Sequence, residues 1–246
     1  MLENIQISKV LFVDLETVSA TADFENLDDR LRDHWRKKSR FVLRVAAGEE
    51  LSEDMIIKSY EEKAAIYAEF GKIICISVGY IHSNSKELRL KSFASDNEKD
   101  LLSDFADLLH QHYSDPNEHL LCGHNIKEFD IPYLCRRMII NSVGLPPMLK
   151  LSGKKPWEAK HLIDTMELWK FGDVKNYTSL DLLAAVLEVD TPKDDIDGSQ
   201  VGPIFWKEGD LQRIVSYCEK DVLTVAQILL RLKGLPLLTE QQIVSV

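Results

Sequence analysis

Residues 9–17 read KVLFVDLET, and this stretch decides the fold. Its β-branched and aromatic first half predicts a buried strand. Residues two apart in a strand point to the same face, so Asp14 and Glu16 project together while Leu15 projects the other way. Two neighbouring acids at the end of an apolar strand repel each other and are costly to desolvate. A bound divalent cation would offset both costs, whereas the alternative is that the strand emerges into water at this point.

Strand and helix patterns alternate along the remainder of the chain. Strands are expected over 72–81, 86–94 and 119–125, and helices over 96–113, 129–144, 178–189 and 209–232. Residues 160–169 read as a strand that leads into a helix. This order predicts an α/β fold in which a mixed β-sheet is flanked by α-helices. Asp96 and Thr178 are the expected N-caps of two of these helices.

Residues 23–70 are charged, with apolar residues at helical spacing, and predict a helical insertion after the first strand. No linker rich in Pro, Gly or Ser divides the chain. One domain spanning residues 1–246 is therefore expected.

The charge balance leaves the partner undecided. The net charge of −10 is not typical of a protein held to polyanions by charge alone. Residues 31–45 and 134–160 nevertheless carry six basic residues against one acid each, a local net charge of +5. Solvated helix faces are the ordinary explanation for such runs.

The cysteines and the N-terminus favour a cytoplasmic protein without a membrane span. None of the cysteines forms a CxxC pair, which is typical of reduced core residues: Cys75, Cys122, Cys135 and Cys218. The N-terminus lacks the basic start and apolar stretch of a signal peptide. No apolar run approaches the ~20 residues that a membrane helix requires.

The stretch CGHNIKEFDIPYL (122–134) supplies a third acid. Asp130 falls in the first turn of a predicted helix, where the helix dipole alone would favour an acid. Asn125, in the preceding turn, is either a turn residue bonded to local backbone or a substrate contact.

The stretch SYCEKDV (216–222) supplies a tyrosine and a fourth acid. Tyr217 and Asp221 are four residues apart, so they share one face of a helix. Because they lie beside the apolar stripe of that helix, they are expected to face a cleft. Glu219 and Lys220 point elsewhere and are expected on the surface.

Together, the D-x-E, N-x4-D and Y-x3-D patterns resemble the DEDD superfamily of 3′→5′ exonucleases, which has a ribonuclease-H-like fold. GHNIKEFDIPYL and IVSYCEKDV are similar to the proofreading exonuclease domain of family B DNA polymerases. The chain is more similar still to stand-alone bacterial proteins predicted to be exonucleases related to that domain. The resemblance extends from Lys9 to Leu232. Tyr217 stands four residues before Asp221, which matches the DEDDy branch; the other branch has histidine at the position of Ser216.

The resemblance implies a metal-dependent 3′→5′ exonuclease that releases nucleoside 5′-monophosphates from single-stranded ends, with DNA favoured over RNA as the substrate. It implies two Mg²⁺ or Mn²⁺ ions, held by Asp14, Glu16, Asp130 and Asp221. Tyr217 would orient the attacking water, because a phenol with a pKa near ~10 is a poor base at neutral pH. The residues implied to hold the terminal nucleotide are Leu15, Thr17, Asn125 and Phe129.

Two other functions stay open at this point. One is a nucleic-acid-binding module without catalysis, and the other is a hydrolase of small nucleotides. Asp164 is expected to be a helix cap or a turn residue, and His124 either contacts substrate or is a satisfied buried histidine. Core or loop packing is expected, before base stacking, for the four tryptophans: Trp35, Trp157, Trp169 and Trp206.

Overall fold

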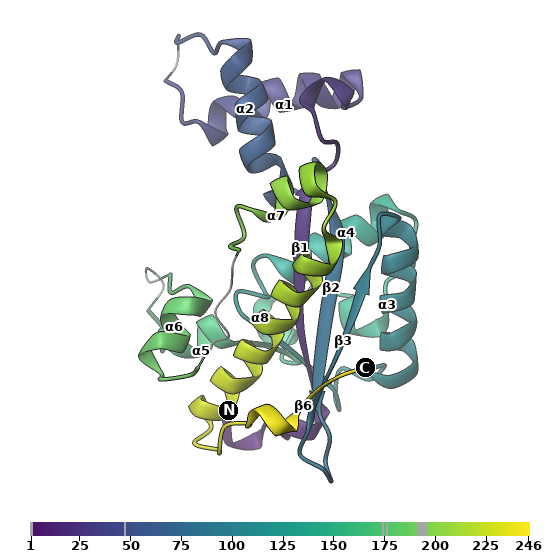
Figure 1. Ribbon diagram of the computed structural model, residues 1–246, viewed down its shortest axis with the longest axis vertical. Helices are drawn as coiled ribbons and strands as arrows, with labels where there is room; N and C mark the ends of the chain where they lie inside the picture. The colour runs from purple at the N-terminus through teal and green to yellow at the C-terminus, as the bar shows by residue number, and fades with distance from the viewer. Residues whose placement is uncertain (1, 47, 174, 176, 191–195) are drawn as a thin grey trace.

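The computed structural model describes residues 2–46, 48–173, 175, 177–190 and 196–246. A mixed sheet runs through its centre in the order β5-β4-β1-β2-β3-β6 (Figure 1). The strands are β1 (Val10–Ser19), β2 (Gly71–Ile81), β3 (Leu88–Ala94), β4 (Leu120–Gly123), β5 (Leu162–Asp164) and β6 (Ile243–Ser245). β1 pairs antiparallel with β2 and parallel with β4, so the first strand lies inside the sheet. The predicted α/β architecture is confirmed.

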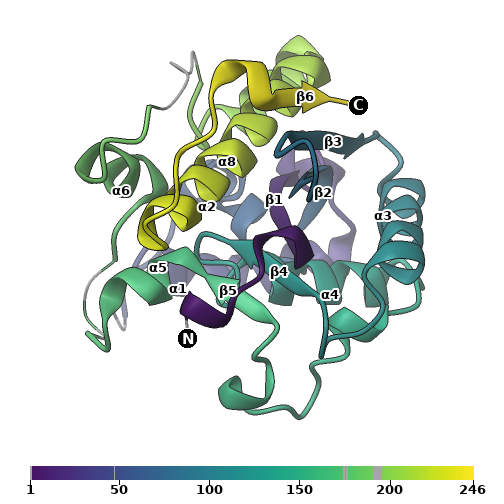
Figure 2. The same ribbon diagram turned by 90° about the horizontal axis from the view of Figure 1, so that it is seen from below.

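Helices cover both faces of the sheet. α8 (Leu211–Leu232) lies on one face, and α3 (Glu98–His112) and α4 (Asp130–Ile140) lie on the other (Figure 2). The short helices α5 (Thr165–Lys170) and α6 (Leu180–Val186) lie beside α8. Leu11, Val13 and Leu15 of β1 enter the core under α3 and α4, whereas Val10 and Phe12 pack against α8. Among the described helices, none is long and apolar enough to cross a membrane.

The predicted helical insertion follows β1. α1 (Asp29–Val42) and α2 (Glu53–Lys63) project from one end of the molecule (Figure 1). Their own aromatic core centres on Trp35, which is fully buried and meets Tyr60 and Phe70 edge-on at centroid distances of 5.5 and 5.0 Å. Such edge-to-face contacts add to the burial of apolar area. Ala47 of this insertion lies outside the described residues.

A buried ion pair fixes α4 against the sheet. Arg137 of α4 donates through Nε to Glu98 Oε1 at 2.8 Å, and the same oxygen accepts the backbone N–H of Ile73 at 2.7 Å. Arg137 also donates to the carbonyl oxygen of Ala68 at 2.8 Å. Because a buried charge needs a partner, this arginine of the second basic run has a structural role.

Two helix caps differ from the prediction. The cap of α3 is Asn97, which accepts the N–H of Lys99 at 3.2 Å, and not Asp96. The cap of α6 is Ser179, which accepts the N–H of Leu182 at 3.3 Å, and not Thr178. In both helices the residue that follows the predicted cap is the one whose side chain accepts a free N–H group of the first turn.

Apart from short 3-10 turns, three of the described elements have no counterpart in the predicted pattern. They are α7 (Val201–Pro203), the π-helical turn η7 (Ile204–Glu208) and the short strand β6. A π-turn closes its hydrogen bonds five residues apart, so a search for a 3.6-residue period does not find it. β6 depends on pairing with β3, which is distant in sequence.

Candidate active site

The central strand β1 presents two acids on the face that α8 covers. Glu16 is buried and Asp14 is half-buried, while the Leu15 side chain between them enters the opposite core. The pairing of β1 with β2 is irregular between Glu16 and Thr17. A bulge bends a strand and re-aims its side chains, and bulges are frequent next to active sites.

The turn after β4 brings a third acid beside β1. A Cβ on Gly123 would lie 2.9 Å from the carbonyl oxygen of Val13, so only glycine lets the turn approach the strand this closely. Asn125 then adopts a left-handed conformation with a φ of 59°. Asp130 begins α4 as a buried residue, and its carboxylate lies near the backbone of Leu15 in β1.

Helix α8 completes the cluster from above the sheet. The Cys218 thiol donates to Asp14 Oδ2 at 3.4 Å, and ligand atoms of Asp14, Glu16 and Cys218 all lie within 4.8 Å of one another. Tyr217 is half-buried and packs against the apolar cluster that contains Cys218. Asp221, one helical turn further on, is close enough to act electrostatically on both acids of β1.

The acids of this cluster hinder one another's ionisation. Burial raises the pKa of Asp14 and of Glu16 well above the ordinary range, and repulsion from Asp221 raises both further. Burial also raises the pKa of Asp130 to about 7, although hydrogen bonds from its own backbone and that of Leu15 oppose the change. Four carboxylates in one low-dielectric site cannot all be ionised at neutral pH without a compensating cation.

The donor set fits a hard divalent cation. Carboxylate oxygens are the ligands that Mg²⁺ and Mn²⁺ prefer. Burial raises the pKa of Cys218, so its sulfur keeps the proton that it donates to Asp14. Cys218 therefore orients the Asp14 carboxylate from α8, and the oxygens of Asp14, Glu16, Asp130 and Asp221 remain as the candidate ligands.

The four residues proposed to hold a nucleotide occupy different environments. The Leu15 side chain is buried, so only its backbone could touch a ligand. Thr17 is half-buried near the phenol of Tyr133, which donates to the carbonyl oxygen of Ala65 at 2.9 Å. The Tyr133 ring lies 5.4 Å from that of half-buried Phe129. Asn125 Oδ1 is buried without a hydrogen-bond partner among the described atoms. An unmet buried acceptor of this kind suits a donor from a ligand or a water.

Asp164 holds the turn that carries Asn125. Its buried carboxylate accepts the backbone N–H groups of Asn125 at 3.0 Å and Lys127 at 3.2 Å. It also caps α5 by accepting from Met166 at 3.0 Å and Glu167 at 3.3 Å. The predicted capping role is confirmed, and it extends to the segment between β4 and α4.

His124 is a histidine whose ring nitrogens both make hydrogen bonds within the protein, which was one of the two expectations for it. Its Nδ1 bonds to the hydroxyl of Thr165 at 2.9 Å, and its Nε2 donates to the carbonyl oxygen of Thr178 at 2.8 Å. Burial lowers the pKa of His124, so a neutral ring is favoured. Both ring nitrogens are used within the protein.

The prediction that Glu219 is a surface residue is wrong. Its carboxylate is half-buried and accepts from Ser92 Oγ at 2.8 Å and Ser245 Oγ at 3.3 Å, which joins α8 to β3 and β6. Lys220 is half-buried as well. Cys218 was expected only in the core, and its contact with Asp14 joins residues too far apart in sequence for a local pattern to reveal.

One family matches the sequence. The family described as a predicted 3′-5′ exonuclease related to the exonuclease domain of PolB matches residues 66–241, more than half of the chain. The matched segment contains Asp130, Tyr217 and Asp221, while Asp14 and Glu16 precede it. No protein of curated function matches the chain.

The raised pKa values predict that stability and metal binding depend on pH. An acid with a raised folded-state pKa binds more protons when folded, so the free energy of unfolding should fall as pH rises from about 4 towards the value of about 7 for Asp130. Thermal unfolding in a chelator should therefore show a lower midpoint at about pH 8 than at about pH 5. Added Mg²⁺ should raise the midpoint at the higher pH and have little effect at the lower one.

The variant Asp130→Asn tests whether Asp130 itself contributes to this pH dependence of stability, as distinct from the acidic residues of the surface. Without metal it should raise the midpoint near neutral pH by roughly 2–4 °C for each kcal/mol of repulsion removed. Asp181→Asn, which changes an exposed acid of α6, is the matched control and should shift nothing. A Mg²⁺ effect of the same size at both pH values would contradict the linkage.

The contacts of Asp164 predict a large cost for Asp164→Ala. This variant removes the acceptor of four backbone N–H groups and should lower the free energy of unfolding by about 2–4 kcal/mol. Denaturant titration measures the change, with Asp181→Ala as the exposed comparison, expected to cost under ~0.5 kcal/mol. Equal effects of the two substitutions would show that the Asp164 contacts do not hold the turn.

Proposed function

The chain belongs to the family of predicted 3′→5′ exonucleases related to the exonuclease domain of PolB, and we propose that it removes nucleotides stepwise from single-stranded 3′ ends. The observation that carries this proposal is the buried cluster of Asp14, Glu16 and Asp130 under Asp221 of α8. Such mutual repulsion destabilises the fold unless the acids serve a cation. DNA is favoured over RNA as the substrate.

The proposal also specifies the branch of the exonuclease superfamily, the cellular location and the bounds of the domain. Tyr217 on the same helix as Asp221 supports the DEDDy branch and a stand-alone enzyme of the bacterial type. The four cysteines are free thiols, which supports a cytoplasmic site of action. We treat residues 1–246 as one exonuclease domain in which α1 and α2 form the insertion.

Asp14, Glu16, Asp130 and Asp221 would hold two divalent cations, Mg²⁺ or Mn²⁺. When bound, the ions lower the pKa of a coordinated water and stabilise the charge on the displaced 3′ oxygen. Four carboxylates and two divalent ions sum to roughly zero charge, so the acidic composition of the chain does not exclude a polyanionic substrate.

The side chains of the protein position the other reactants. Tyr217 would hydrogen-bond the attacking water and fix its direction, since a phenol with a pKa near ~10 accepts a proton poorly at neutral pH. Cys218 restrains the Asp14 carboxylate through its 3.4 Å hydrogen bond. Fixed orientation of this kind contributes to rate because the reacting groups need not be ordered during the reaction.

The terminal nucleotide would lie between β1 and the turn before α4. The unmet Oδ1 of Asn125 is suited to a sugar hydroxyl or a base N–H. The half-buried ring of Phe129 offers an apolar surface to the base or sugar. Leu15 and Thr17 would contribute through their backbone at the bulge of β1.

Digestion of labelled oligonucleotides tests the proposed activity. With Mg²⁺ or Mn²⁺, 5′-labelled single strands should shorten in single steps, and a chelator should stop the reaction. Asp14→Asn and Asp221→Asn should each reduce turnover by at least ~10³-fold, which corresponds to ~4 kcal/mol of lost transition-state stabilisation. Asp181→Asn should retain the wild-type rate.

The same digestion experiment distinguishes the two alternative functions, a binding module and a hydrolase of small nucleotides. Metal-dependent binding of DNA and RNA without degradation would indicate a binding module. Turnover restricted to dinucleotides would indicate a hydrolase of small nucleotides. Wild-type turnover in either folded aspartate variant would refute the metal site itself.

Tyr217→Phe tests the orienting hydrogen bond separately. The variant keeps the ring and loses only the hydroxyl, so kcat should fall about 10- to 100-fold, equivalent to ~1.4–2.7 kcal/mol. Mn²⁺ affinity should be unchanged because no carboxylate is altered. Tyr67→Phe, which removes a hydroxyl beside the helical insertion, is the control. Unchanged kinetics in Tyr217→Phe would show that Tyr217 serves only in packing.

A further inference from the structure

The two basic runs of this acidic chain, residues 31–45 and 134–160, differ in the contacts that their cations make. In the first run, the guanidinium of Arg36 pairs with Glu53 at 2.7 Å, and that of Arg40 donates to backbone carbonyls after α1. The ammonium of Lys38 lies 4.2 Å from the centre of the Tyr67 ring. These three cations stabilise the insertion, which leaves Lys37 and Arg44 as the exposed basic residues of the first run.

The second run contains exposed lysines in the loop before β5. Arg137 is committed to its buried pair with Glu98, but Lys154 and Lys160 are exposed. Within the described parts of the chain, no ion pair involves either of them. Their ammonium groups are therefore available to an anion from solution.

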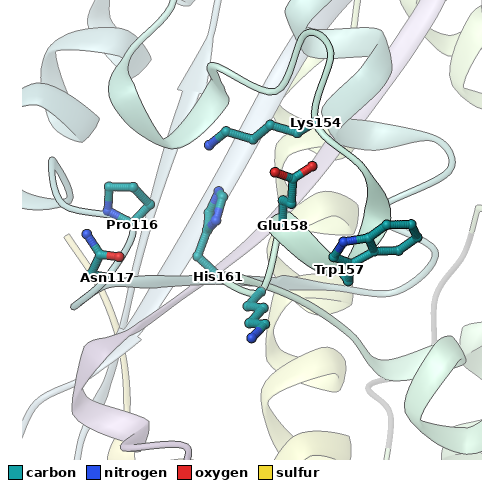
Figure 3. A pocket seen from close by; sticks show the side chains of 7 residues that line it. Pro116, Asn117, Lys154, Trp157, Glu158 and His161 are labelled. Atoms are coloured by element: carbon teal, nitrogen blue, oxygen red, sulfur yellow. The ribbon is translucent and has the colours of Figure 1, made fainter.

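These lysines border a hollow of about 450 Å³. It lies between the loop before β4, which contributes Asn117, and the loop before β5 (Figure 3). Lys154 and Glu158 line one side of it, and His161 lies between the two loops. The hollow is open to solvent, so a ligand bound there would remain partly exposed.

An exposed tryptophan gives the hollow an aromatic surface. Trp157 is 64% exposed, whereas Trp35 is fully buried. The Lys155 ammonium lies 5.0 Å from the centre of its ring, which adds a further cation beside that surface. Aromatic rings of this kind stack on nucleobases regardless of sequence.

Two other polar side chains of the hollow make hydrogen bonds within the protein. His161 is buried and bonds through Nε2 to the carbonyl oxygen of Met148 at 2.9 Å. The Glu158 carboxylate accepts the backbone N–H of Lys155 at 2.8 Å, which closes the local turn. The charged side chains that line the hollow are therefore Lys154, Lys160 and Glu158, which leaves a net positive charge of one for an incoming phosphate.

A second hollow of about 400 Å³ offers no comparable site. Its lysine, Lys72, already lies 4.8 and 4.7 Å from the ring centres of Phe205 and Trp206. The indole N–H of Trp206 donates to Ser19 Oγ at 3.0 Å. The one lysine that lines this hollow and the indole N–H of Trp206 are thus engaged within the protein, whereas Lys154 and Lys160 of the first hollow have no ion pair among the described residues.

We propose that the hollow beside Trp157 binds one nucleotide unit, with its phosphate on Lys154 and Lys160 and its base against the indole. The proposal deepens the proposed function, on which it rests for the identity of the ligand. β4 and β5 begin at the hollow and end at Gly123 and Asp164, beside the catalytic cluster. The bound unit is therefore distinct from the nucleotide being hydrolysed: either another nucleotide of the strand or a free nucleoside 5′-monophosphate.

Tryptophan fluorescence in the presence of Mg²⁺ tests this site without turnover. The ligands are a single strand whose 3′-terminal linkages resist hydrolysis, a nucleoside 5′-monophosphate and inorganic phosphate. Binding of the strand should quench emission in the wild type and much less in Trp157→Phe. The double variant Lys154→Ala/Lys160→Ala should bind the strand about 10-fold more weakly, with a salt slope smaller by about 1.4 for two lost phosphate contacts.

The control is Lys37→Ala/Lys99→Ala, which removes two exposed lysines from α1 and α3. Quenching by strand and monophosphate, or by the strand alone, supports the site and identifies the source of the nucleotide. The proposal is overturned if the two double variants bind alike, if Trp157→Phe quenches like the wild type, or if inorganic phosphate reproduces the whole effect. Because no hydrolysis is needed, intact binding by a protein that degrades no strand would count against the proposed function alone.

Discussion

The burial of like-charged carboxylates on one central strand is the constraint on which the rest of the structure depends. Asp14 and Glu16 share the face of β1 that α8 covers, and Asp130 and Asp221 add charge to the same volume. Such an arrangement is unfavourable in a metal-free protein, because burial and repulsion both oppose ionisation. The fold accepts this cost at its centre, which is typical of a site that a cation completes.

Rigid backbone contacts keep the acids together against that repulsion. Asp164 binds four N–H groups of the segments that follow β4 and β5, and so fixes the turn before Asp130. The buried pair of Glu98 and Arg137 anchors the other end of α4 to β2. Cys218 supports Asp14 from α8. Each contact restrains an element that carries one acid, so the geometry of the cluster comes from the scaffold and not from its own charges.

The sequence predicts what depends on local pattern, namely the strand and helix order, the face shared by Asp14 and Glu16, and the capping role of Asp164. Spacing places the acids and Tyr217 on shared faces of their strand and helix, and the resemblance to the exonuclease superfamily supplies their catalytic roles, which stay predictions. Local sequence patterns do not predict contacts between segments that are far apart in the chain. Glu219 was misplaced because its serine partners are in β3 and β6, and the engaged cations of the first basic run are likewise visible only in the folded chain.

A Mn²⁺ binding isotherm followed by electron paramagnetic resonance tests most directly the claim that the four acids form one metal site. The wild-type protein should bind two Mn²⁺ ions per chain near neutral pH and release them as the pH falls below the range in which Asp130 ionises. Asp14→Asn should abolish tight binding of both ions, because the Asp14 carboxylate is close enough to act electrostatically on all three of the other acids. Binding that is absent, or that persists unchanged in Asp14→Asn, would contradict the assignment.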